Sequence, residues 1–235
     1  MTLTTLGYAF LGGLLPAFIW LYFLLQEDAR HPEPKKMIFY AFVAGMVAVP
    51  LAIPIEQYIQ IQLTGTSTYI AWALIEEVLK YAMAAIFIFW RPAVDEAPDY
   101  VVYMLTVALG FAATENMLFL LNPISSGSIA SSIFTGDIRF IGSTLLHVFA
   151  SASIGFALAF SHGSRPFVRT IAAAAGLILA ITLHTTFNEL IISRGGSTTL
   201  TALFLVWTSA VIFFAAFEVL KFFQYHNFPA KPYQS

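Results

Sequence analysis

The chain has no cysteine and very little charge. Without thiols it has no disulfides, thiolate nucleophile or thiolate zinc ligands, so its chemistry must come from oxygen and imidazole groups. Only 10% of its 235 residues are charged, whereas a soluble domain carries about 25%. The net charge of −2 comes without any run of Lys or Arg, so no basic patch is available for nucleic acid. These absences exclude a soluble enzyme and a nucleic-acid binder.

Hydrophobic residues are abundant instead and make up 59% of the chain. A membrane-spanning helix needs about 20 mostly apolar residues. Seven stretches have about that length: residues 3–25, 37–55, 69–90, 100–121, 139–161, 169–192 and 198–221. Only short polar connections separate them, so we expect a single integral-membrane domain over residues 1–235. The predicted fold class is all-α, a polytopic transmembrane helix bundle of about seven spans.

The positions of Lys and Arg predict the orientation of this bundle. Eight of them lie in the first, third and fifth connections or in the C-terminal tail, and two lie on the other side. Cytoplasmic loops are enriched in Lys and Arg. We therefore expect the N-terminus outside and the C-terminus in the cytoplasm, which requires an odd number of spans.

Ionisable residues inside the predicted spans are candidates for function, because each costs several kcal/mol at membrane depth unless it is paired or hydrated. With about 1.5 Å of rise per helical residue, four of them lie roughly 9–12 Å below the same outer face. These four are Glu76, Glu115, His147 and His184. Lys80 and Asn188 share helix faces with Glu76 and His184 at i+4 spacing, whereas Glu77 points about 100° away from Glu76. The sequence thus predicts one layer of Glu and His in the outer half of the membrane.

Two other roles for this layer stay open. Buried polar residues can simply hold helices together, and the four-residue spacing of Ser143, His147, Ser151 and Gly155 is typical of close helix packing. A transporter or proton relay also places Glu and His at membrane depth. The sequence has no internal repeat, however, and Pro50 and Pro54 interrupt only one predicted helix.

Peptide hydrolysis is a third possibility, and it needs an activated nucleophile. No His is followed by Glu, so the His-Glu-x-x-His zinc motif is absent, and all four aspartates lie in connections. A serine–histidine dyad of Ser143 or Ser151 with His147 stays possible, although such a stripe is more typical of packing. Two mechanisms remain, and spacing does not separate them. A glutamate could act as general base on water, or the Glu/His set could bind a divalent metal such as zinc.

Four ordered motifs carry a family resemblance: Glu76-Glu77-x-x-Lys80, Phe111-x-x-x-Glu115, the intramembrane His147, and His184-x-x-x-Asn188. They resemble the PrsW family of intramembrane proteases, within the superfamily of type II CAAX prenyl proteases and bacterial ABI-type membrane proteases. The Glu- and Pro-rich connection at residues 28–35 is similar to the first loop of that family. The resemblance covers nearly the whole chain.

The resemblance implies a catalytic core at residues 69–192. Its catalytic residues would be Glu76, Glu115, His147, His184 and Asn188. Glu76 would activate water, His147 would orient water or substrate, and Glu115 would be a base partner or a metal ligand. His184 and Asn188 would stabilise the oxyanion, with Glu77 and Lys80 in support. A metal, if one is used, would be bound by the first four catalytic residues.

By the same resemblance, the protein would start regulated intramembrane proteolysis by cutting a membrane-anchored anti-sigma factor on its extracytoplasmic side. The predicted outward depth of the polar layer agrees with this, whereas a CAAX-type role needs a site that faces the cytoplasm. We therefore expect an endopeptidase of the bacterial plasma membrane, glutamic rather than metal-dependent, with no cofactor or with Zn. Its partners would be the lipid bilayer and a single-span protein substrate. A non-proteolytic transporter or scaffold is the alternative, and residues 122–138 would form a substrate gate or an ordinary solvated loop.

Overall fold

The structure is a computed structural model that describes residues 2–27, 32–125, 142–193 and 197–227. Within these ranges all regular elements are helical: α1 (Leu3–Glu27), α2 (Lys35–Gln62), α3 (Thr66–Phe87), α4 (Ala97–Ser125), α6 (Thr144–Phe160), α7 (Pro166–Asn188), the short π-helix η2 (Glu189–Ser193) and α8 (Thr199–Asn227). Their α-helices correspond one to one with the seven predicted spans. The predicted all-α fold class is confirmed.

Five of these helices, α1, α2, α4, α7 and α8, are long and apolar enough to cross a membrane. Of the other two, α6 is apolar but shorter, and α3 carries three charged residues in its middle. Large apolar side chains cover the outside of the bundle, as Leu15 does on α1 and Val211 on α8. Such a surface suits lipid rather than water. The protein is therefore a polytopic helical membrane protein, while its exact number of spans stays a prediction.

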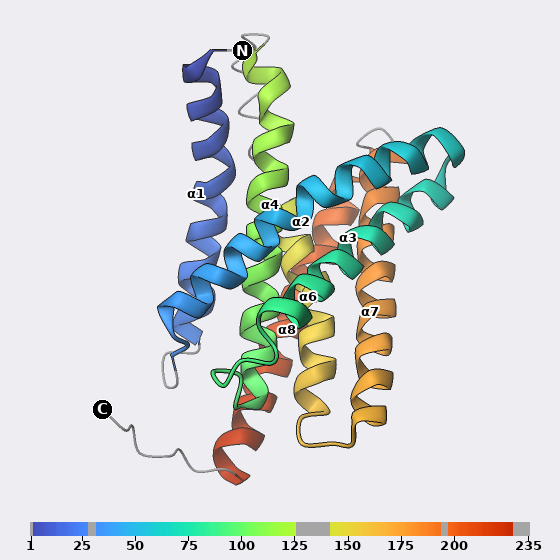
Figure 1. Cartoon of the computed structure of the whole chain (residues 1–235). Helices are drawn as coiled ribbons and strands as arrows, with labels where there is room; N and C mark the ends of the chain where they lie inside the picture. Colours follow the sequence, from blue (N-terminus) through green and yellow to red (C-terminus); the bar gives the residue numbers. More distant parts are fainter. Residues whose placement is uncertain (1, 28–31, 126–141, 194–196, 228–235) are drawn as a thin grey trace.

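The helix connections alternate between the two ends of the bundle. Figure 1 shows that α1, α3, α6 and α8 all end toward the lower end of the bundle. Described basic residues at or next to these helix ends are Lys35, Lys36, Arg91, Arg165, Arg169 and Lys221. The two basic residues predicted on the other side, Arg139 and Arg194, lie outside the described residues, as does most of the segment at 122–138. The orientation in the membrane therefore stays a prediction.

Helix α4 lies at the centre of the bundle and packs against α1, α2 and α6. Its crossing with α2 depends on two glycines. A Cβ on Gly45 would collide with the backbone oxygen of Val107, and a Cβ on Gly110 would collide with that of Phe42. Small residues let helix backbones touch in this way inside a membrane. The predicted close packing of α6 is also found, because a Cβ on Gly155 would lie 2.8 Å from the Cα of Val101 on α4.

Helix α2 differs from its prediction. It stays helical through Pro50 and Pro54 and continues to Gln62, seven residues beyond the expected end of the span at residue 55. The reason is its tilt, because α2 crosses the other helices obliquely and so has a longer path (Figure 1). Its last turns lie against α3, where Trp72 Nε1 donates a hydrogen bond of 3.2 Å to the Glu56 backbone oxygen.

Candidate active site

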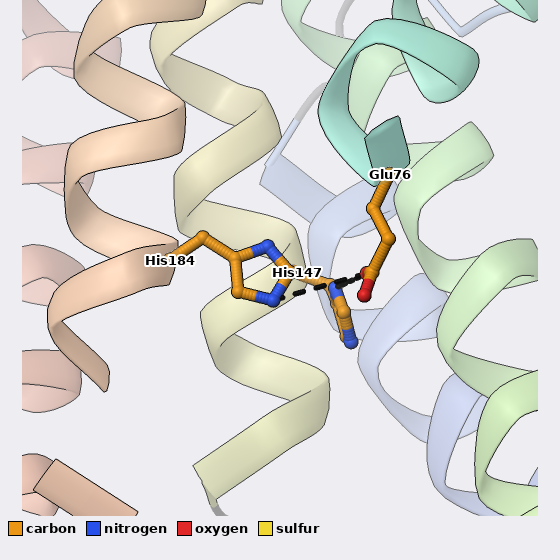
Figure 2. Close-up of side chains that lie close together, drawn as sticks. All are labelled: Glu76, His147 and His184. Atoms are coloured by element: carbon orange, nitrogen blue, oxygen red, sulfur yellow. Dashed lines mark ion pairs between the residues drawn. The ribbon is translucent and has the colours of Figure 1, made fainter. Parts of the chain in front are cut away.

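Three side chains from three helices converge inside the bundle: Glu76 on α3, His147 on α6 and His184 on α7 (Figure 2). We call them the Glu–His–His cluster. Glu76 Oε2 lies 3.8 Å from His147 Nδ1 and 3.8 Å from His184 Nε2. The two imidazole rings meet edge to face, with centroids 5.0 Å apart. All three residues are buried, so the arrangement is shielded from bulk water.

Small residues bring the helices that carry the two histidines together. Gly176 and Ala180 precede His184 at four-residue spacing on α7, and all three are buried. A Cβ on Gly176 would lie 2.8 Å from the Ser153 backbone oxygen on α6. Residues four apart share a helix face. The stripe that makes α6 and α7 touch therefore also aims His184 toward His147.

Each histidine uses its second ring nitrogen to bind a carboxylate. His147 Nε2 lies 3.0 Å from Glu115 Oε2, and His184 Nδ1 lies 2.9 Å from Glu77 Oε1. An ionised carboxylate only accepts hydrogen bonds, so the nitrogen that faces it carries the proton. The other nitrogen, Nδ1 of His147 and Nε2 of His184, then carries no proton and lies 3.8 Å from Glu76 Oε2.

Glu77 connects the helices around the cluster. Its side chain is fully buried and accepts hydrogen bonds from Lys80 Nζ at 2.6 Å, from the Ser151 hydroxyl at 2.8 Å and from His184. Lys80 lies within ion-pair distance of Glu76, at 3.8 Å, as their shared helix face predicts, but its closer partner is Glu77 at 2.6 Å. Burial explains the choice, since a fully enclosed carboxylate needs the nearest cation and a full set of donors.

Lys80 also reaches the cluster. Its Nζ lies 3.0 Å from His147 Nδ1 and 4.4 Å from the centroid of the Phe111 ring. In this structure His147 Nδ1 therefore accepts a hydrogen bond from Lys80, and a metal bound at Nδ1 would have to replace this contact. The Ser151 hydroxyl is directed to Glu77 rather than to His147, which does not favour the serine–histidine dyad.

Asn188 is the predicted site residue for which the described part of the structure shows no hydrogen bond to the cluster. It is half-buried at the last position of α7, where the helix passes into the π-helix η2. Within the described residues, no hydrogen bond joins its side chain to Glu76, His147 or His184. A π turn adds a residue to the helical repeat and turns the side chains that follow. Asn188 itself still belongs to α7, so the π-helix changes the direction only of the residues after it, and the role of Asn188 in the site stays a prediction.

Glu56 is a residue near the cluster that the sequence prediction missed. One oxygen of its half-buried side chain is enclosed and has no hydrogen-bond partner among the described residues. Its charge interacts with those of Glu115 and Lys80, and it also acts on Glu76. The signal in the sequence is a stripe at four-residue spacing on α2 that ends in this glutamate: Ala44, Ala48 and Ala52, all of them buried.

The charges and donors at the site fit a divalent metal ion. Two buried carboxylates, those of Glu76 and Glu77, share the ammonium of Lys80 at 3.8 and 2.6 Å, and Glu115 and Glu56 add further acidic groups that act electrostatically on Glu76. A cation bound among these groups would offset the charge of those carboxylates that are ionised. Carboxylate oxygen and imidazole nitrogen are ligands of zinc, at bond lengths of about 2.0–2.2 Å. The ligand atoms of the Glu–His–His cluster lie within 4.8 Å of one another, and Glu76 Oε2 is enclosed without a hydrogen-bond partner.

Comparison with known proteins gives consistent matches. Residues 33–217 match the family described as PrsW family intramembrane metalloprotease. Protease PrsW of Geobacillus kaustophilus (strain HTA426) is 26% identical over 190 residues, which cover 77% of this chain and 79% of that protein. Protease PrsW of Bacillus subtilis (strain 168) is 28% identical over 113 residues, which cover 46% of this chain and 52% of that protein. No solved structure matches the chain.

Proposed function

The chain belongs to the PrsW family of intramembrane metalloproteases, and on that premise we propose that Glu76, His147 and His184 hold the zinc ion of its peptide-cleaving centre. The protein is an intramembrane protease, integral to the bacterial plasma membrane. We also propose that residues 1–235 form one protease domain with its catalytic core at residues 69–192.

One observation carries the proposal. Both histidines direct one nitrogen at the Glu76 carboxylate and bind another carboxylate, Glu115 or Glu77, with the second nitrogen. Carboxylates behind metal-binding histidines fix the ring orientation and raise the basicity of the ligand. Helix packing alone would need no such convergence of three ligand atoms on one point.

The metal, when bound, would supply Lewis-acid activation of water and of the peptide carbonyl. The residues of the chain orient the ligands, balance their charge and exclude bulk water. Glu115 and Glu77 hold the two imidazole rings in their tautomers, and Lys80 neutralises Glu77. Burial of the cluster excludes bulk water, which strengthens each electrostatic interaction at the site.

The Glu76 Oε2 atom, which has no hydrogen-bond partner among the described residues, also supports a second mechanism. Without a metal, Glu76 Oε2 would take a proton from water, next to Lys80 and the two histidine rings at 3.8 Å. In this mechanism His184 would stabilise the oxyanion only with a proton on Nε2 as well, and the oxyanion role of Asn188 stays a proposal. This is the glutamic mechanism that the sequence suggested, and zinc content separates it from the metal mechanism.

We propose a single-span anti-sigma factor as the substrate, cut near its extracytoplasmic end. His147 is the fourth residue of α6, and α6 runs toward the basic end of the bundle, so His147 lies on the side of α6 that is farther from the basic connections. If the basic end faces the cytoplasm, the cluster lies in the outer half of the membrane. A substrate with an extracytoplasmic cleavage point would reach it there.

The test is cleavage of a tagged single-span anti-sigma factor, reconstituted in liposomes with the wild-type protein or with Glu76→Gln. Each sample is assayed with and without a strong chelator. The metal proposal expects cleavage by wild type alone, its loss with chelator and its recovery with added zinc. Cleavage that resists the chelator but needs Glu76 would instead support the glutamic mechanism. Equal cleavage by both proteins would contradict this site.

A further inference from the structure

Glu56 is the acidic residue near the Glu–His–His cluster whose role the proposal above leaves open. It lies on α2, which crosses obliquely beside α3 and over α4 (Figure 1). Trp72 fixes its backbone through the hydrogen bond of 3.2 Å from Nε1 to the Glu56 oxygen. Trp72 precedes Glu76 by one turn of α3. The Glu56 backbone therefore lies beside the turn of α3 that precedes Glu76, on the side that α2 covers.

The Glu56 carboxylate can accept a hydrogen bond from water or substrate. One carboxylate oxygen is enclosed without a hydrogen-bond partner, and such a group costs free energy until a donor reaches it. The nearby charges are those of Glu115, Glu76 and Lys80. Lys80 donates its closest hydrogen bond to Glu77, so the missing donor has to come from water or substrate.

The other acidic residues at the site are engaged. Glu77 accepts three hydrogen bonds, and Glu115 holds the ring of His147. Glu76 faces the two histidine nitrogens as a metal ligand in the proposed function. Hydrolysis still needs a group that moves a proton from water to the departing nitrogen.

We propose that Glu56 is this proton carrier, an inference that rests on the proposed function. As the water oxygen bonds to the peptide carbonyl carbon, one water proton passes to the Glu56 carboxylate. As the bond between carbon and nitrogen breaks, the same proton passes to the amine nitrogen. Glu56 thus returns to its starting state, and no oxidant, reductant or co-reactant is needed.

The test compares Glu56→Gln, Glu56→Asp and wild type in the liposome assay, with bound zinc measured on each purified protein. Glu56→Gln keeps the size of the side chain but cannot carry the proton, so kcat should fall about 100-fold or more. KM and the zinc content should stay at wild-type values, and Glu56→Asp should recover part of kcat. Glu218→Gln is the control, because that side chain is 66% exposed and pairs with Lys221 on α8.

Several outcomes overturn the inference. A fall in kcat of less than about threefold in Glu56→Gln would remove the proton-carrier role. Loss of zinc together with activity would make Glu56 a group that holds the metal. If Glu56→Gln does not fold, Glu56→Asp decides, because its retracted carboxylate should lower kcat at constant KM and an unchanged kcat contradicts the role. Failure of the wild type to bind zinc or to cleave would instead contradict the proposed function.

Discussion

The two interfaces of the bundle on either side of α4 hold together by different means. Toward α2, Gly45 and Gly110 let the backbones touch, and the contact is apolar. Between α3, α6 and α7, buried charges and hydrogen bonds centre on Glu77. Around Gly45 and Gly110 the first interface is apolar and holds the helices together. The second interface contains the charged groups that catalysis would use. The comparison predicts that changes at the first interface act on stability, whereas changes at the second act on zinc and activity as well.

The largest effect is expected from Glu77→Ala. The change removes three hydrogen bonds and the nearest partner of the buried Lys80 ammonium. Breaking a buried ion pair costs about 3–5 kcal/mol, so we expect loss of both the folded state and the cleavage activity. Thermal unfolding in detergent measures the first. The control Glu218→Ala breaks an exposed pair worth less than about 1 kcal/mol, and equal stability of the two variants would contradict the role of Glu77.

A bulky residue at Gly110, where α4 crosses α2, should lower the stability of the protein without changing the zinc affinity of the folded fraction. In Gly110→Val the new side chain meets the Phe42 backbone oxygen on α2, and overpacking of this kind costs about 1–3 kcal/mol or more. We expect a lower unfolding temperature, while the fraction that stays folded keeps normal zinc affinity. Gly7→Ala is the matched control, since nothing lies within 4 Å of its added Cβ. Wild-type stability of Gly110→Val would show that the backbones do not touch there.

Glu115→Gln should weaken zinc binding without unfolding the protein. Its carboxylate orients the His147 ring through Nε2, and loss of such a partner lowers metal affinity about 10–100-fold. Competition titration with a zinc-binding dye on the purified protein gives the affinity. An affinity equal to that of wild type would mean that Glu115 has no part in placing His147.

The smallest effect is expected from Ser151→Ala. Its hydroxyl donates one of the three hydrogen bonds that Glu77 accepts, so stability should fall by about 1 kcal/mol. Cleavage in the liposome assay should continue at a similar rate. Complete loss of cleavage in a folded protein would instead identify Ser151 as a nucleophile.

The sequence was sufficient for the helices and for the gathering of Glu76, His147 and His184, because helical rise sets depth and four-residue spacing sets the helix face. The hydrogen-bond partners of the site residues depend on tertiary contacts, which the sequence does not show. The 100° separation of Glu77 from Glu76 does not say which donors meet it, and Lys80, Ser151 and His184 come from three helices.

The role of two other residues depends on helix geometry that a single sequence does not reveal. Glu56 lies past the expected end of its span, and only the oblique path of α2 brings it near the cluster. Asn188 is the last residue of α7, and the π-helix η2 begins directly after it. Neither the oblique path of α2 nor the π-helix follows from the apolar spacing of the sequence.

The most direct test of the account is the zinc content of purified, cleavage-active protein, combined with X-ray absorption at the zinc edge. We predict one zinc ion per chain, with two imidazole nitrogens and a carboxylate oxygen at about 2.0–2.2 Å, and loss of that ion in His184→Ala. Active protein without zinc, or zinc bound equally well by His184→Ala, would contradict the claim that the Glu–His–His cluster is a metal site.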